Sequence, residues 1–214
     1  MTPDERSRAG VRATFDRIAS HFSQTRQRAW PAVAEFLGEA GPAELGLDAG
    51  CGNGRHLEPL GERVDRAIGL DFSRGILNEA VDRLGGSSGK IQLLQAEIGT
   101  LPLRDDCIDV ALCIATIHHL PNQRARIEAL REVGRVLDPA GCGLISAWSV
   151  THDKFDATSG FDTTIDWTLP DGDTVPRFYH IYDRDEFVSD MEAAGLEIQR
   201  CWVSAGNCYG TVRP

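Results

Sequence analysis

The chain has 214 residues, with 22 Lys plus Arg against 32 Asp plus Glu and a formal net charge of −10. This length suits one α/β domain with a full core, and the acidic balance argues against an extended nucleic-acid-binding face unless a partner supplies the basic surface. No apolar run approaches the roughly 18 residues of a membrane span, and the first 30 residues carry scattered charges in place of an apolar signal core. We expect one cytoplasmic domain over 1–214, with no role for a membrane.

Arginine supplies nearly all the positive charge, because Lys90 and Lys154 are the only lysines. An acidic, lysine-poor surface is typical of halophilic proteins, and the arginine codons of a GC-rich genome produce the same bias. We expect a halophilic source. The six cysteines contain no C-x-x-C pair, so we expect neither a metal site nor a disulfide framework.

Hydrophobic spacing predicts two helices before the first strand, one carrying Val11, Phe15, Ile18 and Phe22 and the next following Pro31. Strands and helices then alternate. Strands are expected over 44–48, 64–71, 91–94 and 108–114, and helices over 53–61 and 73–84. Residues 85–89 are expected to form a flexible turn, and the apolar run 108–114 predicts a central parallel strand buried on both faces.

The second half of the chain continues this pattern with one interruption. Asn122 is expected to cap a helix that runs to Leu137, and a fifth strand follows over 142–148. Residues 149–176 are rich in Asp, Thr and Gly and too long for a plain connection, which predicts a functional or mobile segment. A helix from Asp183 and an antiparallel hairpin over 196–203 and 207–212 complete an α/β, Rossmann-like fold. We expect seven strands, mostly parallel with an antiparallel last strand, helices on both faces and two N-terminal helices.

Three alternating glycines, Gly50, Gly52 and Gly54, follow the first predicted strand. Glycine allows positive φ and close approach of backbone N–H groups to a ligand at the start of a helix. Asp71 ends the second strand, where a carboxylate reaches ribose hydroxyls. The spacing differs from the G-x-G-x-x-G of dinucleotide binders. Behind the acidic Asp48, it resembles motif I of the class I S-adenosylmethionine-dependent methyltransferases.

This resemblance implies S-adenosylmethionine as the cofactor. Glu97 would accept from the adenine amine, while Ile98 would cover the ring and offer its backbone N–H. Asp48 would orient the methionine ammonium through water, helped by carbonyls near Ile114 and Ala115. The expected cofactor-binding residues are Asp48, Gly50, Cys51, Gly52, Asn53, Gly54, Asp71, Phe72, Glu97, Ile98, Ile114 and Ala115.

Residues 114–120 (IATIHHL) resemble the block after the fourth strand of the tRNA wobble-uridine carboxymethyl methyltransferases, which esterify a 5-carboxymethyl group. Residues 18–26, 144–148 and 177–182 resemble further segments of the same family. The resemblance implies a tRNA substrate and a heterodimer with a small zinc-binding activator protein along the strand-three edge. Within the single domain we expect a helical lid over 1–40 and a substrate-side insertion over 149–180.

A carboxylate acceptor is ionised at pH 7, so it needs positive charge and hydrogen-bond donors and no strong base. Arginine can grip such a group with two hydrogen bonds. The expected acceptor-side residues are Arg26, His118, His119, Arg177, Tyr179 and His180. An amine or hydroxyl acceptor would instead require a base, for which His119 is the candidate. Two alternatives stay open. One is a small-molecule class I methyltransferase, and the other is a non-catalytic cofactor-binding scaffold that acts through a partner.

Overall fold

The computed structural model describes residue 4 and residues 6–85 and 89–214. Its main sheet has the strand order β3-β2-β1-β4-β5-β9-β8, with β9 antiparallel to both of its neighbours and the other paired strands parallel. The strands are β1 (Ala43–Ala49), β2 (Val64–Asp71), β3 (Ile91–Gln95), β4 (Ile108–Ile114), β5 (Leu137–Trp148), β8 (Glu197–Ser204) and β9 (Asn207–Arg213). The predicted seven-stranded sheet with its antiparallel last strand and edge hairpin is confirmed.

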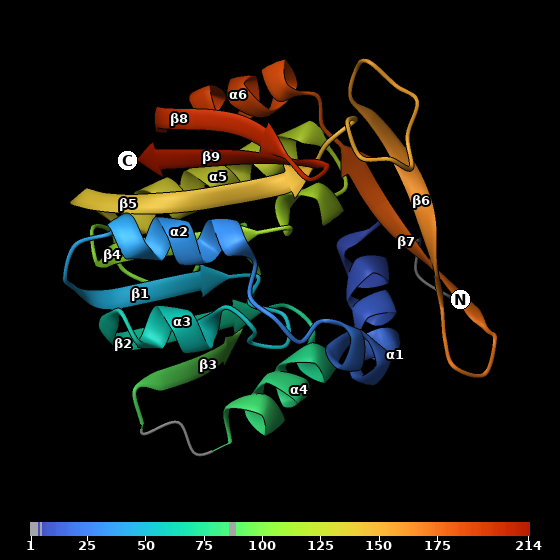
Figure 1. Cartoon of the computed structure of the whole chain (residues 1–214), viewed down its shortest axis with the longest axis horizontal. Coiled ribbons are helices and arrows are strands. Elements are labelled where there is room, and N and C mark those ends of the chain that lie inside the picture. The colour runs from blue at the N-terminus through green and yellow to red at the C-terminus, as the bar shows by residue number, and fades with distance from the viewer. Residues whose placement is uncertain (1–3, 5, 86–88) are drawn as a thin grey trace.

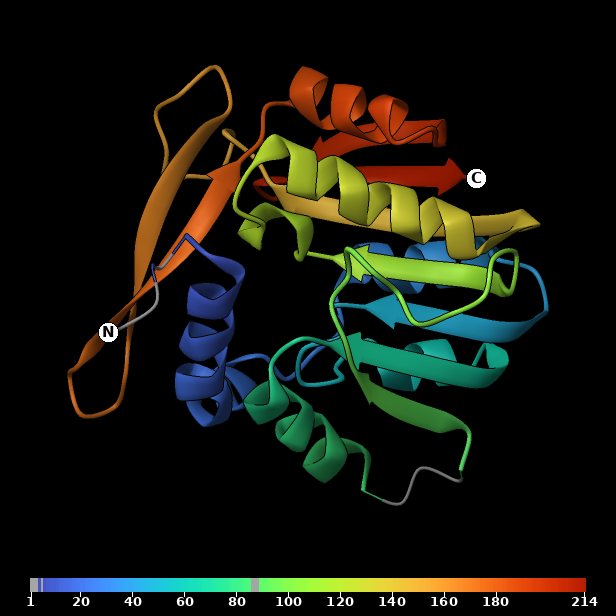
Figure 2. The ribbon, with the colours of Figure 1, turned by 180° about the vertical axis from the view of Figure 1, so that it is seen from behind.

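Helices cover both faces of this sheet (Figures 1 and 2). One face packs against α2 (Pro31–Glu39), α3 (Leu57–Gly61) and α4 (Arg74–Leu84), and the other against α5 (Gln123–Val136) and α6 (Arg184–Ala193). Each fully buried leucine of these two cores contributes about 1.5–3 kcal/mol. Within the described residues, no helix is both long enough and apolar enough to cross a membrane.

Side-chain caps begin three helices at the predicted positions. Ser73 Oγ accepts from the Ile76 N–H at 3.1 Å, and Asn122 Oδ1 and Asp183 Oδ1 each accept from the N–H three residues ahead at 2.9 Å. Each such cap stabilises its helix by about 1 kcal/mol because it satisfies a backbone donor that has no partner inside the helix.

Two predicted boundaries are wrong. The helix expected over 53–61 begins only at Leu57, because Gly54 has φ +77° and cannot belong to a right-handed helix. Strand β5 begins at Leu137 instead of 142, since Leu137 pairs with Ile108 and a register irregularity absorbs the Pro139 segment. Residues 86–88 of the expected turn at 85–89 lie outside the described part of the chain.

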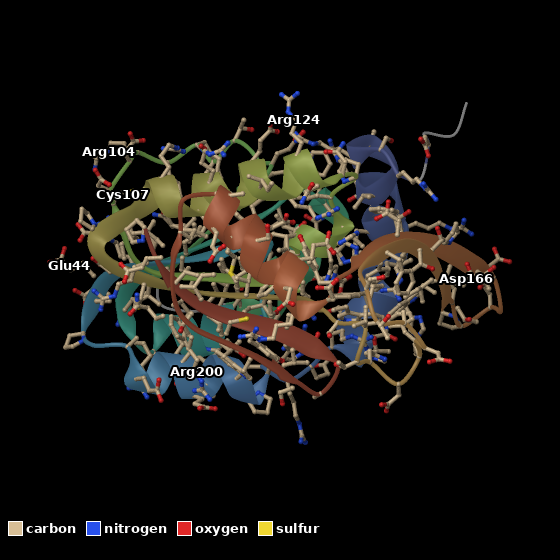
Figure 3. The ribbon with its side chains drawn as sticks, turned by 90° about the horizontal axis from the view of Figure 1, so that it is seen from above. Glu44, Arg104, Cys107, Arg124, Asp166 and Arg200 are labelled. Atoms are coloured by element: carbon tan, nitrogen blue, oxygen red, sulfur yellow. The ribbon has the colours of Figure 1, made fainter. Side chains whose placement is uncertain are left out.

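Residues 149–176 do not form a plain connection, because they contain β6 (Phe161–Thr168) and the start of β7 (Thr174–Ile181), which pair as a separate antiparallel hairpin. Trp167 is buried while its neighbours Asp166 and Thr168 are exposed, and Figure 3 shows Asp166 at the outer side of the hairpin. This alternation of period two is the signal that the composition of the segment concealed. The hairpin and α1 (Arg8–Thr25) lie together across the carboxyl ends of the parallel strands (Figure 1).

Candidate active site

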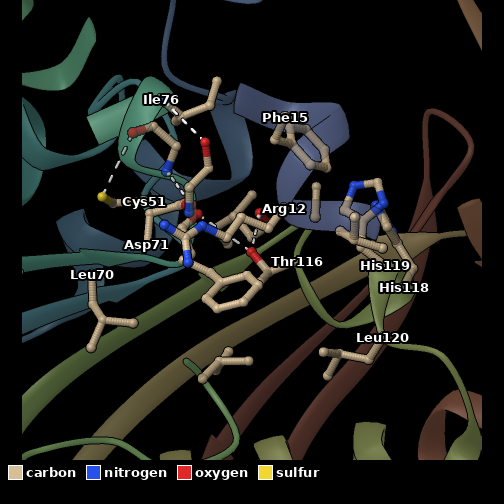
Figure 4. Close-up of a pocket in the computed structure, with 18 of the residues that line it drawn as sticks. Arg12, Phe15, Cys51, Leu70, Asp71, Ile76, Thr116, His118, His119 and Leu120 are labelled. Atoms are coloured by element: carbon tan, nitrogen blue, oxygen red, sulfur yellow. Dashed lines mark hydrogen bonds between the residues drawn. The ribbon is translucent and has the colours of Figure 1, made fainter. Parts of the chain in front are cut away.

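A cavity opens at the carboxyl ends of β1, β2 and β4, under α1 and the β6–β7 hairpin, where open α/β sheets bind their ligands. Figure 4 shows Cys51 and Asp71 on one side of it and His118 and His119 on the other. Of the eighteen predicted site residues, Asp48, Gly54 and His180 do not line it. Those that do are Arg26, Gly50, Cys51, Gly52, Asn53, Asp71, Phe72, Glu97, Ile98, Ile114, Ala115, His118, His119, Arg177 and Tyr179.

The glycine turn requires residues without a side chain, because its φ angles are positive and it packs closely against Thr116. Gly50 has φ +84°, and a Cβ there would collide with the Thr116 side chain. Gly52 has φ +55°, and its N–H donates to Asp71 Oδ2 at 2.9 Å. Gly54 instead faces α4. Because α3 starts three residues after Gly54, the turn itself, and not a helix N-terminus, forms this wall of the cavity.

Asp71 is held at the rim of the cavity by two backbone donors. Its Oδ2 accepts from Gly52 and its Oδ1 accepts from the Ser73 N–H, each at 2.9 Å. Burial raises the pKa of Asp71, whereas these N–H groups lower it. Each carboxylate oxygen keeps a second lone pair, so the fixed carboxylate can accept from the two hydroxyls of a ribose.

Asp48 is fully buried behind Gly50, and neither of its carboxylate oxygens has a hydrogen-bond partner in the described part of the chain. Burial raises its pKa to about 7, although the positive charge of Arg55 opposes the shift. A buried anion without a partner is costly. The ammonium group of a methionine moiety, acting directly or through water, would supply the missing charge.

Arg55, which the sequence interpretation missed, lies half-buried in the cavity wall with its guanidinium 5.1 Å from the Trp30 ring centroid. Burial, followed by the charge of Arg26, lowers the pKa of Arg55 to about 10. No carboxylate lies within 4 Å of it among the described residues. Arg55 in the cavity wall and Asp48 buried behind that wall carry opposite charges, which fit the zwitterionic end of the cofactor. The sequence signal was an arginine directly after the third glycine.

Apolar side chains and one acid form the opposite end of the cavity. Ile98 and Phe72 line it, and Glu97 Oε2 pairs with Arg8 of α1 at 2.6 Å. This pair is about one-third exposed and therefore contributes at most about 1 kcal/mol. Glu97 Oε1 lies outside the pair. This end therefore matches an adenine, with apolar contacts for the ring and an acceptor for its amine.

Helix α1 is fastened over the cavity by polar contacts. Asp16 Oδ1 accepts from Ser73 Oγ at 2.6 Å and from the Gly75 N–H at 2.8 Å, and the buried Asn53 amide donates to the Arg26 carbonyl at 2.9 Å. Phe15 and Phe22 of α1 line the cavity and also pack against the small apolar cluster of Ile18, Trp167 and Val175. The helical spacing of the apolar residues predicted this face of α1, but it did not predict that the face borders a cavity.

Two arginines meet at the acceptor end over one aromatic ring. The guanidinium carbons of Arg26 and Arg177 lie 5.3 and 4.6 Å from the ring centroid of Trp167. The Trp167 Nε1–H donates to His21 Nδ1 at 3.0 Å. Arg177 is 7% exposed, and burial lowers its pKa; Tyr179 opposes this shift and the charge of Arg26 adds to it. Neither arginine has a carboxylate within 4 Å in the described residues. Tyr179 lies beside them, with its ring centroid 5.1 Å from the guanidinium carbon of Arg177.

The two histidines sit on a short 3₁₀ turn, η1 (Ile117–His119), at the end of β4. His118 Nδ1 accepts from the Trp148 N–H at 3.0 Å, and His119 Nδ1 donates to the Phe178 carbonyl at 2.9 Å. Burial holds the pKa of His118 well below its usual range and lowers that of His119 to about 3. Both rings are therefore neutral at pH 7.

His180 faces away from the cavity, because on β7 it lies on the opposite side from Arg177 and Tyr179. Its Nδ1 lies 2.8 Å from Asp162 Oδ1 and its Nε2 lies 2.9 Å from Glu186 Oε1, which ties the hairpin to α6. The ring is thus engaged in structural contacts. The alternation of side chains along a strand would have predicted that His180 lies on the opposite face of the strand from Arg177 and Tyr179.

The sequence of the chain is similar to those of known methyltransferases. Residues 47–145 match the family model described as a methyltransferase domain. The tRNA (carboxymethyluridine(34)-5-O)-methyltransferase of Saccharomyces cerevisiae is 32% identical over 180 residues, which cover 81% of this chain and 61% of that protein. A methyltransferase homologue of Encephalitozoon cuniculi is 32% identical over 195 residues, covering 88% of this chain and 87% of that protein.

Solved structures share the fold at low identity. The DhpI–SAH complex superposes with a TM-score of 0.75 at 19% identity, covering 97% of this chain and 98% of that one. A structure of the Haloferax volcanii Trm112 methyltransferase activator in complex with a second protein superposes with a TM-score of 0.69 at 16% identity. The match covers 95% of this chain and 96% of that one. The chain spans 61%, 20% and 33% of the yeast, mouse and Arabidopsis thaliana tRNA methyltransferases that it matches. With its glycine turn, Asp71 and this sheet topology, the chain belongs to the class I S-adenosylmethionine-dependent methyltransferases.

Proposed function

We propose that this enzyme methylates a carboxylate, the 5-carboxymethyl group of a wobble uridine in tRNA. The observation that carries the proposal is the pair Arg26 and Arg177, two guanidiniums over Trp167 with no carboxylate within 4 Å in the described residues. Two like charges at a buried site are unfavourable unless an anion binds between them. The names of the yeast, mouse and Arabidopsis relatives support a carboxymethyluridine as that anion.

The residues of the pocket suit such an acceptor. S-adenosylmethionine, when bound, supplies a methyl group on a sulfonium, and the transfer to an oxygen is an in-line displacement that depends on alignment. Arg26 and Arg177 hold and orient the carboxylate. No proton has to leave an ionised carboxylate, and with a pKa of about 3 His119 is a poor base for an amine or hydroxyl.

We also propose a small zinc-binding activator as a partner in a heterodimer. Strand β3 is an edge of the sheet, and the large apolar side chains Leu94 on β3 and Val81 on α4 are 37% and 55% exposed. An unpaired edge with apolar neighbours is suited to β-strand addition by another chain. The Haloferax volcanii complex with an activator, which has the same fold, supports this assignment. The partner would also supply the basic surface that a chain of net charge −10 lacks.

Mass spectrometry of tRNA nucleosides from cells with and without the gene tests the proposal. We expect the methyl ester of 5-carboxymethyluridine to disappear and the free acid to accumulate in its absence. An unchanged nucleoside profile would contradict the proposal and favour a small-molecule acceptor. The net charge of −10 is the observation that favours this second candidate.

A further inference from the structure

His118 and His119 present opposite hydrogen-bonding groups to the cavity. His118 Nδ1 accepts from a backbone N–H, so the proton of the neutral ring is on Nε2. His119 Nδ1 faces a carbonyl, which can only accept, so the proton of that ring is on Nδ1 and Nε2 carries a lone pair. Backbone atoms of Trp148 and Phe178 therefore fix one Nε2 as a donor and the other as an acceptor.

The two Nε2 atoms have no hydrogen-bond partner in the described part of the chain, while both rings line the cavity and their centroids are 4.4 Å apart (Figure 4). Arg26 and Arg177, the cations beside them, are donors only. A carboxylate bound there would satisfy these donors and leave the lone pair of His119 Nε2 unpaired. An unpaired acceptor in a buried site costs free energy, so its natural partner is an N–H of the substrate.

Donor and acceptor side by side are complementary to an N–H next to a C=O. We propose that the two histidines read the imide edge of a uracil ring, with His119 Nε2 accepting from N3–H and His118 Nε2–H donating to O4. This inference rests on the proposed function and adds a specificity-determining role to it. A cytosine in the same pose would place its amine against the His118 donor and its unprotonated N3 against the His119 lone pair, so it would be rejected.

The test uses anticodon stem-loop RNA that carries 5-carboxymethyluridine, its N3-methyl derivative or 5-carboxymethylcytidine, with the activator present. For the wild type we expect kcat/KM to fall about 10- to 100-fold on the two analogues, since each loses a hydrogen bond and leaves its partner unpaired. Binding of each RNA in the presence of S-adenosylhomocysteine gives the same comparison without turnover.

His119→Asn provides a matched variant, because an asparagine amide can still donate to the Phe178 carbonyl but has no atom at Nε2. We expect it to lose about tenfold in kcat/KM on 5-carboxymethyluridine and to show nearly equal values for the N3–H and N3-methyl RNAs. His118→Asn keeps an acceptor for the Trp148 N–H and should lose its discrimination against the cytidine analogue. Thermal unfolding with bound S-adenosylhomocysteine shows whether either variant is folded.

The outcomes separate this inference from the proposed function. Two results would overturn the proposed recognition of the uracil edge and leave the carboxylate acceptor unaffected. One is equal kcat/KM of the wild type on the N3–H and N3-methyl RNAs. The other is a folded His119→Asn variant that prefers the N3–H RNA as strongly as the wild type does. Failure of the wild type to methylate or bind 5-carboxymethyluridine RNA at all would overturn both.

Discussion

Replacing Asp48 by Asn should remove a pH dependence from cofactor binding. The pKa of Asp48 is raised from 3.8 to about 7 by burial, and its two oxygens have no hydrogen-bond partner among the described residues. The ammonium of S-adenosylhomocysteine would favour the ionised carboxylate. If only that form binds the ammonium, affinity rises with pH up to about 7, and at pH 6 it is about tenfold weaker than on the alkaline plateau.

The same group affects stability in the opposite direction. The folded-state pKa is raised, so the protonated form favours the native state, and stability of the ligand-free protein falls as pH rises from about 4 to about 7. The loss is on the order of 4 kcal/mol. Asp48→Asn removes the buried charge. The variant should therefore be more stable than the wild type above pH 7 while binding the cofactor product more weakly there.

Calorimetry between pH 5.5 and 8.5, in two buffers of different ionisation enthalpy, measures affinity and proton release together. At pH 6 the wild type should release roughly 0.9 proton on binding, and Asp48→Asn should release none from this site. Denaturant unfolding of the ligand-free proteins gives the stability comparison. A pH-independent affinity in the wild type, or a variant that matches it at pH 8 in both affinity and stability, would refute the assignment of Asp48.

Asp71→Ala should weaken S-adenosylmethionine binding by about 1.5–3 kcal/mol in titration calorimetry, because it removes a charged acceptor, and unchanged affinity would argue against a ribose contact. Arg177→Ala should cut turnover strongly and leave cofactor binding nearly intact, with only partial rescue by Arg177→Lys and no steep rise in rate through the histidine pH range. A single ionisation near 6.5 that disappears in His119→Ala would point instead to a general base. The chain expressed alone should aggregate, and co-expression with the zinc-binding activator should make it soluble. Leu94→Lys should weaken the complex with the activator in pull-down assays. A monomer that is stable and fully active by itself would contradict the proposal of a partner. Circular dichroism after dialysis from molar to low KCl should show loss of structure if the source is halophilic, and retained structure would exclude that origin.

The parts of the site that depend on neighbouring residues in the chain were predictable. The glycine turn, the placement of Asp71 at a strand end and the cap at Ser73 all follow from short-range rules, and the structure has each of them. The wrong helix start at residue 53 also has a local cause. A glycine motif suggests a helix behind it, but the positive φ that makes Gly54 useful delays that helix until Leu57.

Other features depend on contacts between distant segments, which periodicity does not show. Arg26 and Arg177 are 151 positions apart, and only the docking of the hairpin on α1 through Trp167 brings them together. Phe15 was correctly assigned to an apolar helix face, yet no pattern in α1 shows whether that face covers a core or a cavity. The hydrogen-bonding character of His119 depends on a carbonyl 59 residues away.

Under the proposed function an acidic protein selects an anion, and this is possible because the charge of the pocket differs from the net charge of the whole chain. A net charge of −10 acts through solvent, where salt screens interactions beyond about 8–10 Å. Arg26, Arg55 and Arg177 act inside the cavity at much shorter range and lower effective dielectric, and in the described residues none of them has a carboxylate within 4 Å. An anionic group that enters gains these donors without having to displace an internal acid. Net charge therefore limits how the chain captures a large polyanion from solution, which is why we propose that a partner supplies the basic surface, but it does not set the charge of the group that reacts.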